Sequence, residues 1–527
     1  TVGFRGEAYS GQLEATNPRG TQLTWTIESG PDWLSINPAT GELSGTIPLD
    51  HRSVLEPFPL PGFSMDLQIQ YCRAKTLIHY RESCPVDTIG IGIDDGTVKT
   101  VWPVHIDLFD AGEVQGPVVD GHAYQTVLAD AVFTDAQNFI YVVGATGGGM
   151  DGNNGLGLDD VFFKKLDDRH VEQWTRIIGS NGADRVVSSV MDSSEDIYLY
   201  IYSNGDWRPF VGDTSNPTSD KRLVAKVSRS GELNWVVELA DSTGVSVTPV
   251  PNEMDNHLLA SLPGGGVRVL VNSELLDIDA LGNVSSHASI NLGFRTWRIA
   301  VADDGSTVLT GEAKLSRLDS SGSELWTADL GGQPQILRTG HSIEFDSTGG
   351  IIVSGSSLNP SLDGGGWFLA RYTLDGAQSW FNAFTMADDI GKYQDIGPNG
   401  VFIDSSDNIF VAGRMWLETF TDDPFGGDYD TVSKFDPSGT LLWYSKLWRV
   451  EGEKYMSIAV NSTNNLVVVG GGSSGARIEY PNQFECSEQE PCSRELRVAR
   501  NDWATLNIPG GSRDYYLLTL DSNGAEK

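Results

Sequence analysis

Apolar and polar positions alternate along this chain in short runs that are separated by turns of Asp, Ser, Asn and Gly. Residues 161–166 (VFFKKL) and 368–372 (FLARY) are examples, and both are rich in residues that favour β-strands. Each run leads into a nine-residue phrase of one apolar residue, Asp or a similar residue, two further residues, Gly, three variable residues and Trp. The phrase predicts a hairpin turn with a positive φ at its Gly, followed by a returning strand that carries the Trp.

The phrase recurs seven times, and its copies begin at Leu166, Val227, Ile278, Leu318, Tyr372, Phe435 and Leu520. A second hairpin precedes each copy, for example in residues 343–355 and 401–413. Two hairpins form a four-stranded sheet, and isolated hairpins are only marginally stable in water. Seven such sheets therefore predict an all-β chain whose residues 121–527 form a seven-bladed β-propeller.

Three copies depart from the phrase. The first has His170 in the place of Gly, the third has Ser286 in the place of Trp, and the seventh ends at Lys527 before its last strand. Because an incomplete blade would leave a bare sheet edge, we expect residues 111–120 to form a linker whose end supplies a ring-closing strand. The alternative is that the natural chain continues beyond Lys527.

Residues 1–110 read as a second all-β domain. Residues 23–36 and 42–46 predict strands, and the segment Pro38-Ala39-Thr40-Gly41 between them predicts a turn. This order predicts a β-sandwich that precedes the propeller. Residues 49–87 interrupt it and contain a Pro-rich part, which we expect to form an extended surface loop.

Two resemblances follow from these motifs. Residues 160–203, which begin with Asp160-x-Phe162-x-x-Lys165-Leu166, resemble the SBBP-type repeat of bacterial secreted β-propellers, and residues 428–439 and 514–524 fit the same pattern. Residues 1–110 resemble the dystroglycan-type cadherin-like, or Ig-like, module of bacterial surface proteins. The resemblances imply a secreted or cell-surface protein with a spacer or adhesive module, and they say little about its ligand. The third phrase departs most, so its blade is expected to be irregular or to be a docking place.

The charge narrows the choice of partners. The formal net charge is −35, from 36 Lys and Arg against 71 Asp and Glu. Nucleic acid is not an expected partner, because its binding depends on Lys and Arg against phosphate. The acidity serves solubility or the binding of divalent cations. No apolar stretch reaches the roughly 18 residues of a transmembrane helix, and the chain, which begins at Thr1 without a signal peptide, is expected to be a mature or trimmed form.

The four cysteines fall into two local pairs, Cys72 with Cys84 and Cys486 with Cys492. Their even number and local spacing, without a Cys-x-x-Cys motif, predict two disulfides formed in an oxidising, extracellular compartment. A zinc site is the alternative, but the histidines lack the spacing for one.

Two clusters of oxygen-bearing side chains are candidate calcium sites, because Ca²⁺ is bound by carboxylate and amide oxygens of flexible loops. The first comprises Asp151, Asn153, Asn154, Asp159 and Asp160, and the second, with the weaker signal, comprises Asp422, Asp423, Asp428 and Asp430. Neither follows the spacing of an EF-hand loop. The same residues also form ordinary turns, so each cluster is either a calcium site or a plain loop.

No motif points to catalysis, and we name no catalytic residue. There is no Gly-x-Ser-x-Gly and no His-Glu-x-x-His segment. The Trp residues of the phrase are expected to pack between blades, whereas aromatic residues outside it, such as Trp207 and Phe210, are expected to be exposed. The insertion of residues 473–513 is expected to be a contact surface, because long loops on rigid scaffolds often bind partners.

The sequence thus predicts an extracellular, non-catalytic surface, matrix or adhesion protein, whose propeller is a rigid scaffold for binding or self-assembly. The expected partners are a protein or a glycan at the cell surface, or further copies of the chain, and the expected cofactor is at most Ca²⁺. The alternative is a carbohydrate-active enzyme, a glycoside hydrolase or polysaccharide lyase, with its site on one face of the propeller.

Overall fold

The computed structural model describes most of the strands and the shorter connections of the chain. The described residues are 2–13, 15, 22–48, 86–96, 99–109, 118–120, 127–148, 150, 155–211, 220–239, 258–330, 337–358, 365–385, 397–414, 429–448, 456–473, 493–494 and 513–522. The chain divides into two compact units: Thr1–Val118 with Asp167–Val171, and Val119–Leu166 with Glu172–Lys527.

The N-terminal unit is a sandwich of two sheets. One sheet has the order β1-β7-β6-β3 and the other the order β2-β5-β4. The strands are β1 (Val2–Phe4), β2 (Ala8–Gln12), β3 (Thr24–Ser29), β4 (Leu34–Ile36), β5 (Glu42–Thr46), β6 (Val86–Asp94) and β7 (Lys99–Phe109). Side chains from both sheets, among them Trp25, Leu43, Ile89 and Ile106, are buried together as its core. In β2 and β5, Tyr9 and Leu43 are buried between exposed neighbours, as a two-layer β fold requires.

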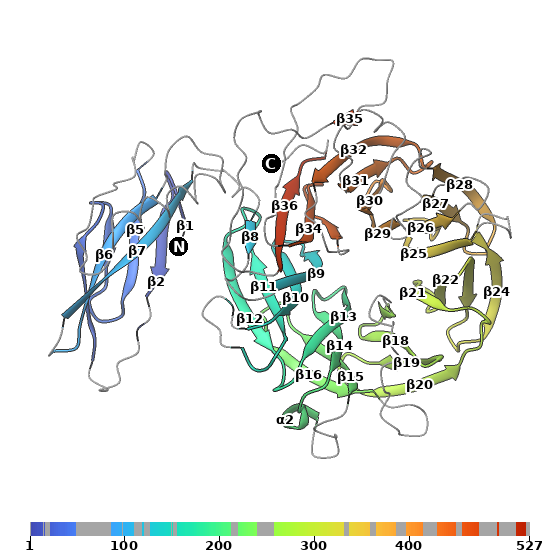
Figure 1. Ribbon diagram of the computed structural model, residues 1–527, viewed down its shortest axis with the longest axis horizontal. Helices are drawn as coiled ribbons and strands as arrows, with labels where there is room; N and C mark the ends of the chain where they lie inside the picture. The colour runs from blue at the N-terminus through green and yellow to red at the C-terminus, as the bar shows by residue number, and fades with distance from the viewer. Residues whose placement is uncertain are drawn as a thin grey trace. The chain divides into compact units, whose positions relative to one another are not determined.

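The C-terminal unit is a ring of seven sheets within the described residues (Figure 1). In the first six, the four main strands follow chain order from the centre outwards. The first three blades are β9 (Val127–Thr134), β10 (Ile140–Thr146), β11 (Asp160–Leu166) and β12 (Glu172–Ile178); β13 (Asp184–Met191), β14 (Ile197–Ser203), β15 (Lys221–Val227) and β16 (Leu233–Glu238); and β17 (Leu259–Ser261), β18 (Val267–Val271), β19 (Glu274–Ile278) and β20 (Val284–Ser289).

The next three blades are β21 (Thr296–Val301), β22 (Thr307–Gly311), β23 (Lys314–Leu318) and β24 (Glu324–Asp329); β25 (Leu337–Phe345), β26 (Ile351–Leu358), β27 (Gly365–Tyr372) and β28 (Gln378–Thr385); and β29 (Gly397–Ile403), β30 (Ile409–Arg414), β31 (Tyr429–Phe435) and β32 (Leu441–Trp448). A short strand, β35 (Ser493–Arg494), adds to the outer edge of the sixth blade in parallel with β32. The seven-bladed propeller and the preceding sandwich confirm the expected fold class.

The seventh blade contains strands from both ends of the propeller sequence. Its order is β33 (Met456–Val460), β34 (Leu466–Ser473), β36 (Arg513–Leu520) and β8 (Val118–Asp120). The inner strands of the last and first blades are joined directly, because the Val132 N–H donates to Ser457 Oγ at 3.2 Å and Thr134 Oγ1 donates to the Val460 carbonyl at 3.0 Å. These bonds close the ring.

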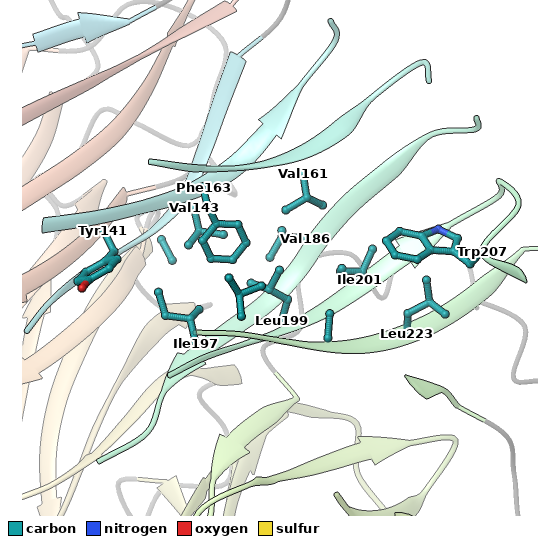
Figure 2. Packing of buried hydrophobic residues seen from close by; sticks show 13 residues of the cluster. Tyr141, Val143, Val161, Phe163, Val186, Ile197, Leu199, Ile201, Trp207 and Leu223 are labelled. Carbon is teal, nitrogen blue, oxygen red and sulfur yellow. The ribbon is translucent and has the colours of Figure 1, made fainter. Parts of the chain in front are cut away.

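Apolar side chains between the blades hold the ring together. In Figure 2, Val143, Val161 and Phe163 of the first blade point toward Val186 and Leu199 of the second. The middle strands are buried on both faces, as β15 shows along its whole length, whereas in the outer strand β12 only Thr175 is buried. Burial on both faces explains why the middle strands are continuous apolar runs. No described helix is long and apolar enough to cross a membrane.

Candidate functional site

The two ends of the propeller ring are built differently. Turns that join the first strand to the second, and the third to the fourth, lie on one end, which we call the turn face. Connections between the second and third strands, and between blades, lie on the other end, the loop face. In the first blade the turn face has residues 135–139 and 167–171, whereas the described residues of the loop face are 147–148, 150 and 155–159. The turn face is therefore regular, and the loop face carries the variable segments.

The Asp that recurs in these turns is a cap for the backbone. Asp436 Oδ1 accepts the N–H groups of Ser438 and Thr440, both at 2.9 Å, and Gly439 has a φ of +81°. Asp279 and Asp319 likewise accept the backbone N–H groups that lie two and four residues further along their own turns. The Asp, the small polar residues and the Gly of the phrase thus serve local geometry and carry no sign of chemistry.

At several junctions the repeated Trp joins one blade to the following one. Trp235 Nε1 donates to the carbonyl oxygen of Ala280 at 3.1 Å, and Trp326 Nε1 donates to that of Leu374 at 3.0 Å. In both cases the acceptor is the third residue of the next phrase. These indoles pack between blades, so they are not a surface for stacking sugars.

The third blade replaces this indole contact by an arginine. Arg268, only 3% exposed, donates Nε and Nη2 to the Asp277 carboxylate at 2.7 and 2.8 Å. Its Nη1 donates to the Gly305 carbonyl at 3.0 Å and to Thr307 Oγ1 at 2.7 Å, both in the fourth blade. The third blade keeps four strands, and the residue opposite Asp277 is Ser285. Its junction with the fourth blade therefore has this polar contact in addition to the apolar cluster that the two blades share.

A buried polar cluster lies on the loop face where the first and second blades meet. Asp160 begins β11, Asp184 begins β13, and neither has exposed surface. Asp184 Oδ2 accepts the N–H and hydroxyl of Ser180 at 2.6 and 2.8 Å. Trp207 Nε1 donates to Asp184 Oδ1 at 2.9 Å and to Ser203 Oγ at 2.8 Å.

This cluster fastens three connections to one another. The Leu158 N–H donates to the Gly182 carbonyl at 2.8 Å, and the Asp184 N–H donates to the Asp159 carbonyl at 2.7 Å. The Asp206 N–H donates to Asn181 Oδ1 at 2.9 Å. Residues 155–159, 179–183 and 204–208 are therefore joined by hydrogen bonds into one element, which we call the loop latch.

A buried lysine completes the loop latch. Lys221, at the start of β15, is fully buried and donates Nζ to the Gly205 carbonyl at 2.7 Å. Burial lowers the pKa of its ammonium, and the neighbouring carboxylates, Glu238 before Asp206 and Asp184, act against this. Burial raises the pKa of the Asp160 carboxyl, which the N–H groups of Leu156 and Gly157 oppose and the charge of Asp184 reinforces. Low solvent access is thus the main electrostatic feature of the cluster.

Apolar side chains lie exposed on and beside the loop latch. Leu156 is 51% exposed, Leu158 69% and Phe210, which belongs to the short helix α2 (Arg208–Val211), 47%. The Phe210 ring lies 5.2 Å from the ring of Trp207. The expectation that Trp207 is exposed was wrong, because its N–H is held by Asp184 and Ser203 inside the latch. Only Phe210 of this pair is available at the surface.

The structure describes part of the first candidate calcium cluster. Asp159 Oδ2 accepts Nε and Nη2 of Arg185 at 3.1 and 2.8 Å, whereas Asp160 Oδ2 accepts the N–H groups of Leu156 and Gly157 at 2.7 and 3.2 Å. The two neighbouring carboxylates therefore have different partners. Asp151, Asn153 and Asn154 lie outside the described residues.

The structure does not describe the side chains of the remaining predicted site residues. Asp430 lies on β31 and pairs with Leu447 along the backbone. The other members lie outside the described residues, namely Asp422, Asp423, Asp428, Cys72, Cys84, Cys486 and Cys492. Within the part of the chain that is described, no group of three or more His, Cys, Asp or Glu is arranged to hold a metal ion. Calcium binding and the two disulfides stay predictions.

Sequence reasoning missed Asp184 and Lys221, and it named Trp207 only as an exposed aromatic residue. Each stands outside the nine-residue phrase, and their contacts join segments from different hairpins. A polar residue at the first position of a buried strand is the signal that finds two of them, because Asp160, Asp184 and Lys221 all begin strands on the loop face.

A curated relative gives a limited comparison. It is an uncharacterized WD repeat-containing protein of Acanthamoeba polyphaga mimivirus, 22% identical over 393 residues, which cover 63% of this chain and 28% of the relative. The matched region thus spans less than a third of that protein.

Solved structures give distant likenesses. An inactive variant of virginiamycin B lyase from Staphylococcus aureus with quinupristin is 9% identical, with 67% of this chain and 94% of that chain covered and a TM-score of 0.39. A gluconolactonase from Xanthomonas campestris is 15% identical, with 49% and 84% covered and a TM-score of 0.27. At such scores these likenesses carry no argument about activity.

A family model matches the start of the chain. Residues 3–53 match the family described as "Putative Ig domain". These residues contain β2, β3, β4 and β5 and much of the sandwich core. The N-terminal unit is therefore Ig-like, and the remainder of the chain is a seven-bladed β-propeller.

Proposed function

We propose that this protein is an extracellular, non-catalytic surface or matrix protein that binds a partner through the loop face of its propeller. The observation that carries the proposal is the difference between the two faces. The turn face repeats one kind of short turn in blade after blade and exposes the apolar side chain of Leu281, whereas the loop face has connections of varied length and gathers the exposed side chains of Leu156, Leu158 and Phe210 at one place. Exposed apolar side chains on a rigid support are typical of interaction sites.

Three further features support an extracellular location. The N-terminal unit is Ig-like, a kind of module common in surface proteins, and the net charge is −35. The cysteines are spaced as two local pairs, which suits an oxidising compartment. We also propose that the blades are SBBP-type repeats, as the sequence from Asp160 to Ser203 suggests.

The partner is a protein or a glycan at the cell surface, or another copy of this chain. Nucleic acid stays an unexpected partner because of the negative charge. Calcium, where residues 151–160 or 422–430 bind it, serves to order the loops of this face.

The test compares two variants that lose exposed apolar side chains from different parts of the propeller. In the first, Leu156, Leu158 and Phe210 are replaced by Ser; in the second, Leu325 and Leu442, which are 51% and 43% exposed on outer strands, are replaced by Ser. Each is immobilised and exposed to the native extracellular fraction and to a panel of surface polysaccharides. We expect the loop-face variant alone to lose the bound species, while both keep the wild-type melting temperature.

Three results would contradict the proposal. Equal binding by the two variants would remove the loop face as the binding surface. Binding that is lost only in the outer-strand variant would place the site on the ring's rim. Turnover of a polysaccharide by the wild-type chain would favour the alternative of a carbohydrate-active enzyme.

A further inference from the structure

One position of the inner strands changes character in the fifth blade. In every blade the first strand pairs with the second, and in β25 the second pair counted from the connecting turn is Glu344 with Ile352. The residues at this position in the other six blades are apolar, namely Phe133, Val190, Ala260, Ala300, Phe402 and Ala459. The first and third pairs place no charged residue on any of the seven inner strands. Glu344 is therefore the one charged residue in three successive rows of these strands.

The Glu344 side chain opens toward the inside of the ring. β26 lies on the outer side of β25, and β21 and β29 of the adjoining blades pack on its two faces (Figure 1). Glu344 is nevertheless exposed, whereas each of its six equivalents is half-buried or buried. Because strands occupy the other three sides, a small molecule reaches this carboxylate from the centre of the propeller.

The carboxylate has no counter-charge among the described residues. None of them donates a hydrogen bond to Glu344 or forms an ion pair with it. Reduced hydration inside the ring, with no other cause, raises the pKa of the Glu344 carboxyl to about 7. A carboxylate with few water neighbours and no partner is a place where a cation gains more than it would at an outer surface.

The charged groups of the elements around β25 are engaged or distant. Arg317 and Lys314 of β23 are paired with Asp304 and Asp329. Arg298 of β21 stands two pairs further from the turn than the row of Glu344. The strands β22, β26 and β29 carry no charged residue.

The remaining charged groups belong to β25 and to the turn that follows it. Asp346 accepts a hydrogen bond from Arg371 at 2.6 Å. The side chains of Arg338 and His341 lie outside the described residues. Neither group of the turn is therefore left to neutralise Glu344.

We propose that the inside of the ring binds an alkylammonium group at Glu344, with the ammonium on the carboxylate and the alkyl stem along the apolar rows. Charge-assisted hydrogen bonds of this kind are among the strong ones. Ca²⁺ does not fit, because it takes six to eight oxygens and these rows hold one carboxylate. A guanidinium fits less well, since it has five N–H groups to satisfy where an ammonium has three.

Two sources share this chemistry, a free primary amine and the lysine side chain of a partner. Either one enters from the turn-face end of the ring, because Glu344 lies one residue from the end of β25 that leads into the turn at residues 346–350. The site goes beyond the proposed function, since it lies on other strands than Leu156, Leu158 and Phe210 and does not depend on them.

The test titrates the full chain with n-butylamine, at constant ionic strength, and follows binding by ligand-observed NMR. The variants are E344Q and, as the matched control, E324Q, which removes an exposed carboxylate from the outer strand β24. We expect E344Q to weaken binding about tenfold or more, E324Q to bind as the wild type does, and n-butanol not to bind. E344Q should fold, because six blades already carry an uncharged residue at this position.

A second readout uses the wild type alone. The cation holds Glu344 in its ionised form, so binding well below pH 7 should release close to one proton for each amine, and binding well above pH 7 should release almost none. Calorimetry in two buffers of different ionisation enthalpy measures this release. A peptide with one lysine and blocked ends, compared with its acetyl-lysine form, separates a partner's side chain from a free amine, and binding of either source supports the site.

Four outcomes would overturn the proposal. These are equal affinity of n-butylamine for E344Q and wild type, equal weakening in E324Q, binding of n-butanol as tight as that of the amine, and proton release that does not change with pH. Loss of partner binding in the variant of Leu156, Leu158 and Phe210 would leave the amine titration unchanged, so the two proposals fail separately.

Discussion

The indole of Trp326 lies against Gly376 of the next blade so closely that a Cβ on the glycine would be 2.8 Å from the ring atom Cδ2. Other junctions repeat this relationship, with Trp174 against Gly231 and Trp235 against Gly282. The glycine thus has two duties, since it also adopts the positive φ of the turn. The nine-residue phrase therefore recurs because the same contact between the Trp ring and the next turn Gly is made at successive blades.

Replacing Gly376 by Ala should therefore destabilise the propeller through two effects. The φ of +85° costs a residue with a Cβ about 1 kcal/mol, and the conflict with the Trp326 ring adds about 1–3 kcal/mol. Gly349 of the same blade is the matched control, because its φ is +77° and a Cβ there meets nothing within 4 Å. Denaturant unfolding followed by Trp fluorescence measures both. Equal losses in G376A and G349A would show that the indole contact contributes nothing.

Replacing Arg268 by Met should weaken the junction between the third and fourth blades. The change leaves Asp277, whose side chain is 17% exposed, without its bidentate partner. Breaking a buried pair in this way costs about 3 kcal/mol. Lys314→Met is the control, because the Lys314–Asp329 pair is 39% and 51% exposed and should contribute under about 1 kcal/mol.

The double variant R268M/D277L separates two contributions to the loss of stability: the loss of the ion pair itself, and the unpaired buried charge that R268M leaves on Asp277. We expect it to regain much of the stability that R268M loses, because no buried carboxylate remains unpaired. A double variant as unstable as R268M would instead assign the effect to the bonds from Arg268 to Gly305 and Thr307.

The residues of the phrase and those of the buried polar contacts differ in how well the sequence predicts them. The turn Asp, the Gly and the Trp act within one hairpin or on its neighbour, so their fixed spacing predicted strands, turns and the number of blades. Arg268 and Asp277 follow no such spacing, and their pairing crosses from β18 to β19 in a blade whose phrase is altered. The loop latch was harder still to predict from the sequence, because Asp160, Asp184 and Trp207 come together only when two blades pack against each other.

Replacing Trp207 by Phe should loosen the loop latch. The ring volume is largely kept, but Asp184 and Ser203 lose the indole N–H that both accept, and a lost bond to a buried charged group costs about 1–3 kcal/mol. Phe210→Ser removes an aromatic ring next to it that is 47% exposed and should change stability by under about 0.5 kcal/mol. Hydrogen exchange of residues 204–208 reports the local effect, and unchanged protection in W207F would contradict the role given to the indole.

The capped turns should make the propeller sensitive to acid. The hydroxyl of Ser438, with the N–H groups of Thr440 and Ser438, lowers the pKa of Asp436 below its usual value of 3.8. Hydrogen bonds from Asn283 and from Ser321 lower the pKa of Asp279 and of Asp319 in the same way. A carboxylate with a lowered folded pKa contributes its full stability above the unfolded value and loses it as the pH falls further.

The wild type should therefore lose melting temperature as the pH is taken below 3.8, and the triple variant D279N/D319N/D436N should lose less. Asn keeps the oxygen that accepts the two backbone N–H groups, but it carries no charge to lose, so the difference between the two curves isolates these turns from other carboxylates. Melting temperatures from near neutral pH down to the acid limit give both slopes. Parallel curves would mean that the caps act through geometry alone, with no contribution from the ionised form.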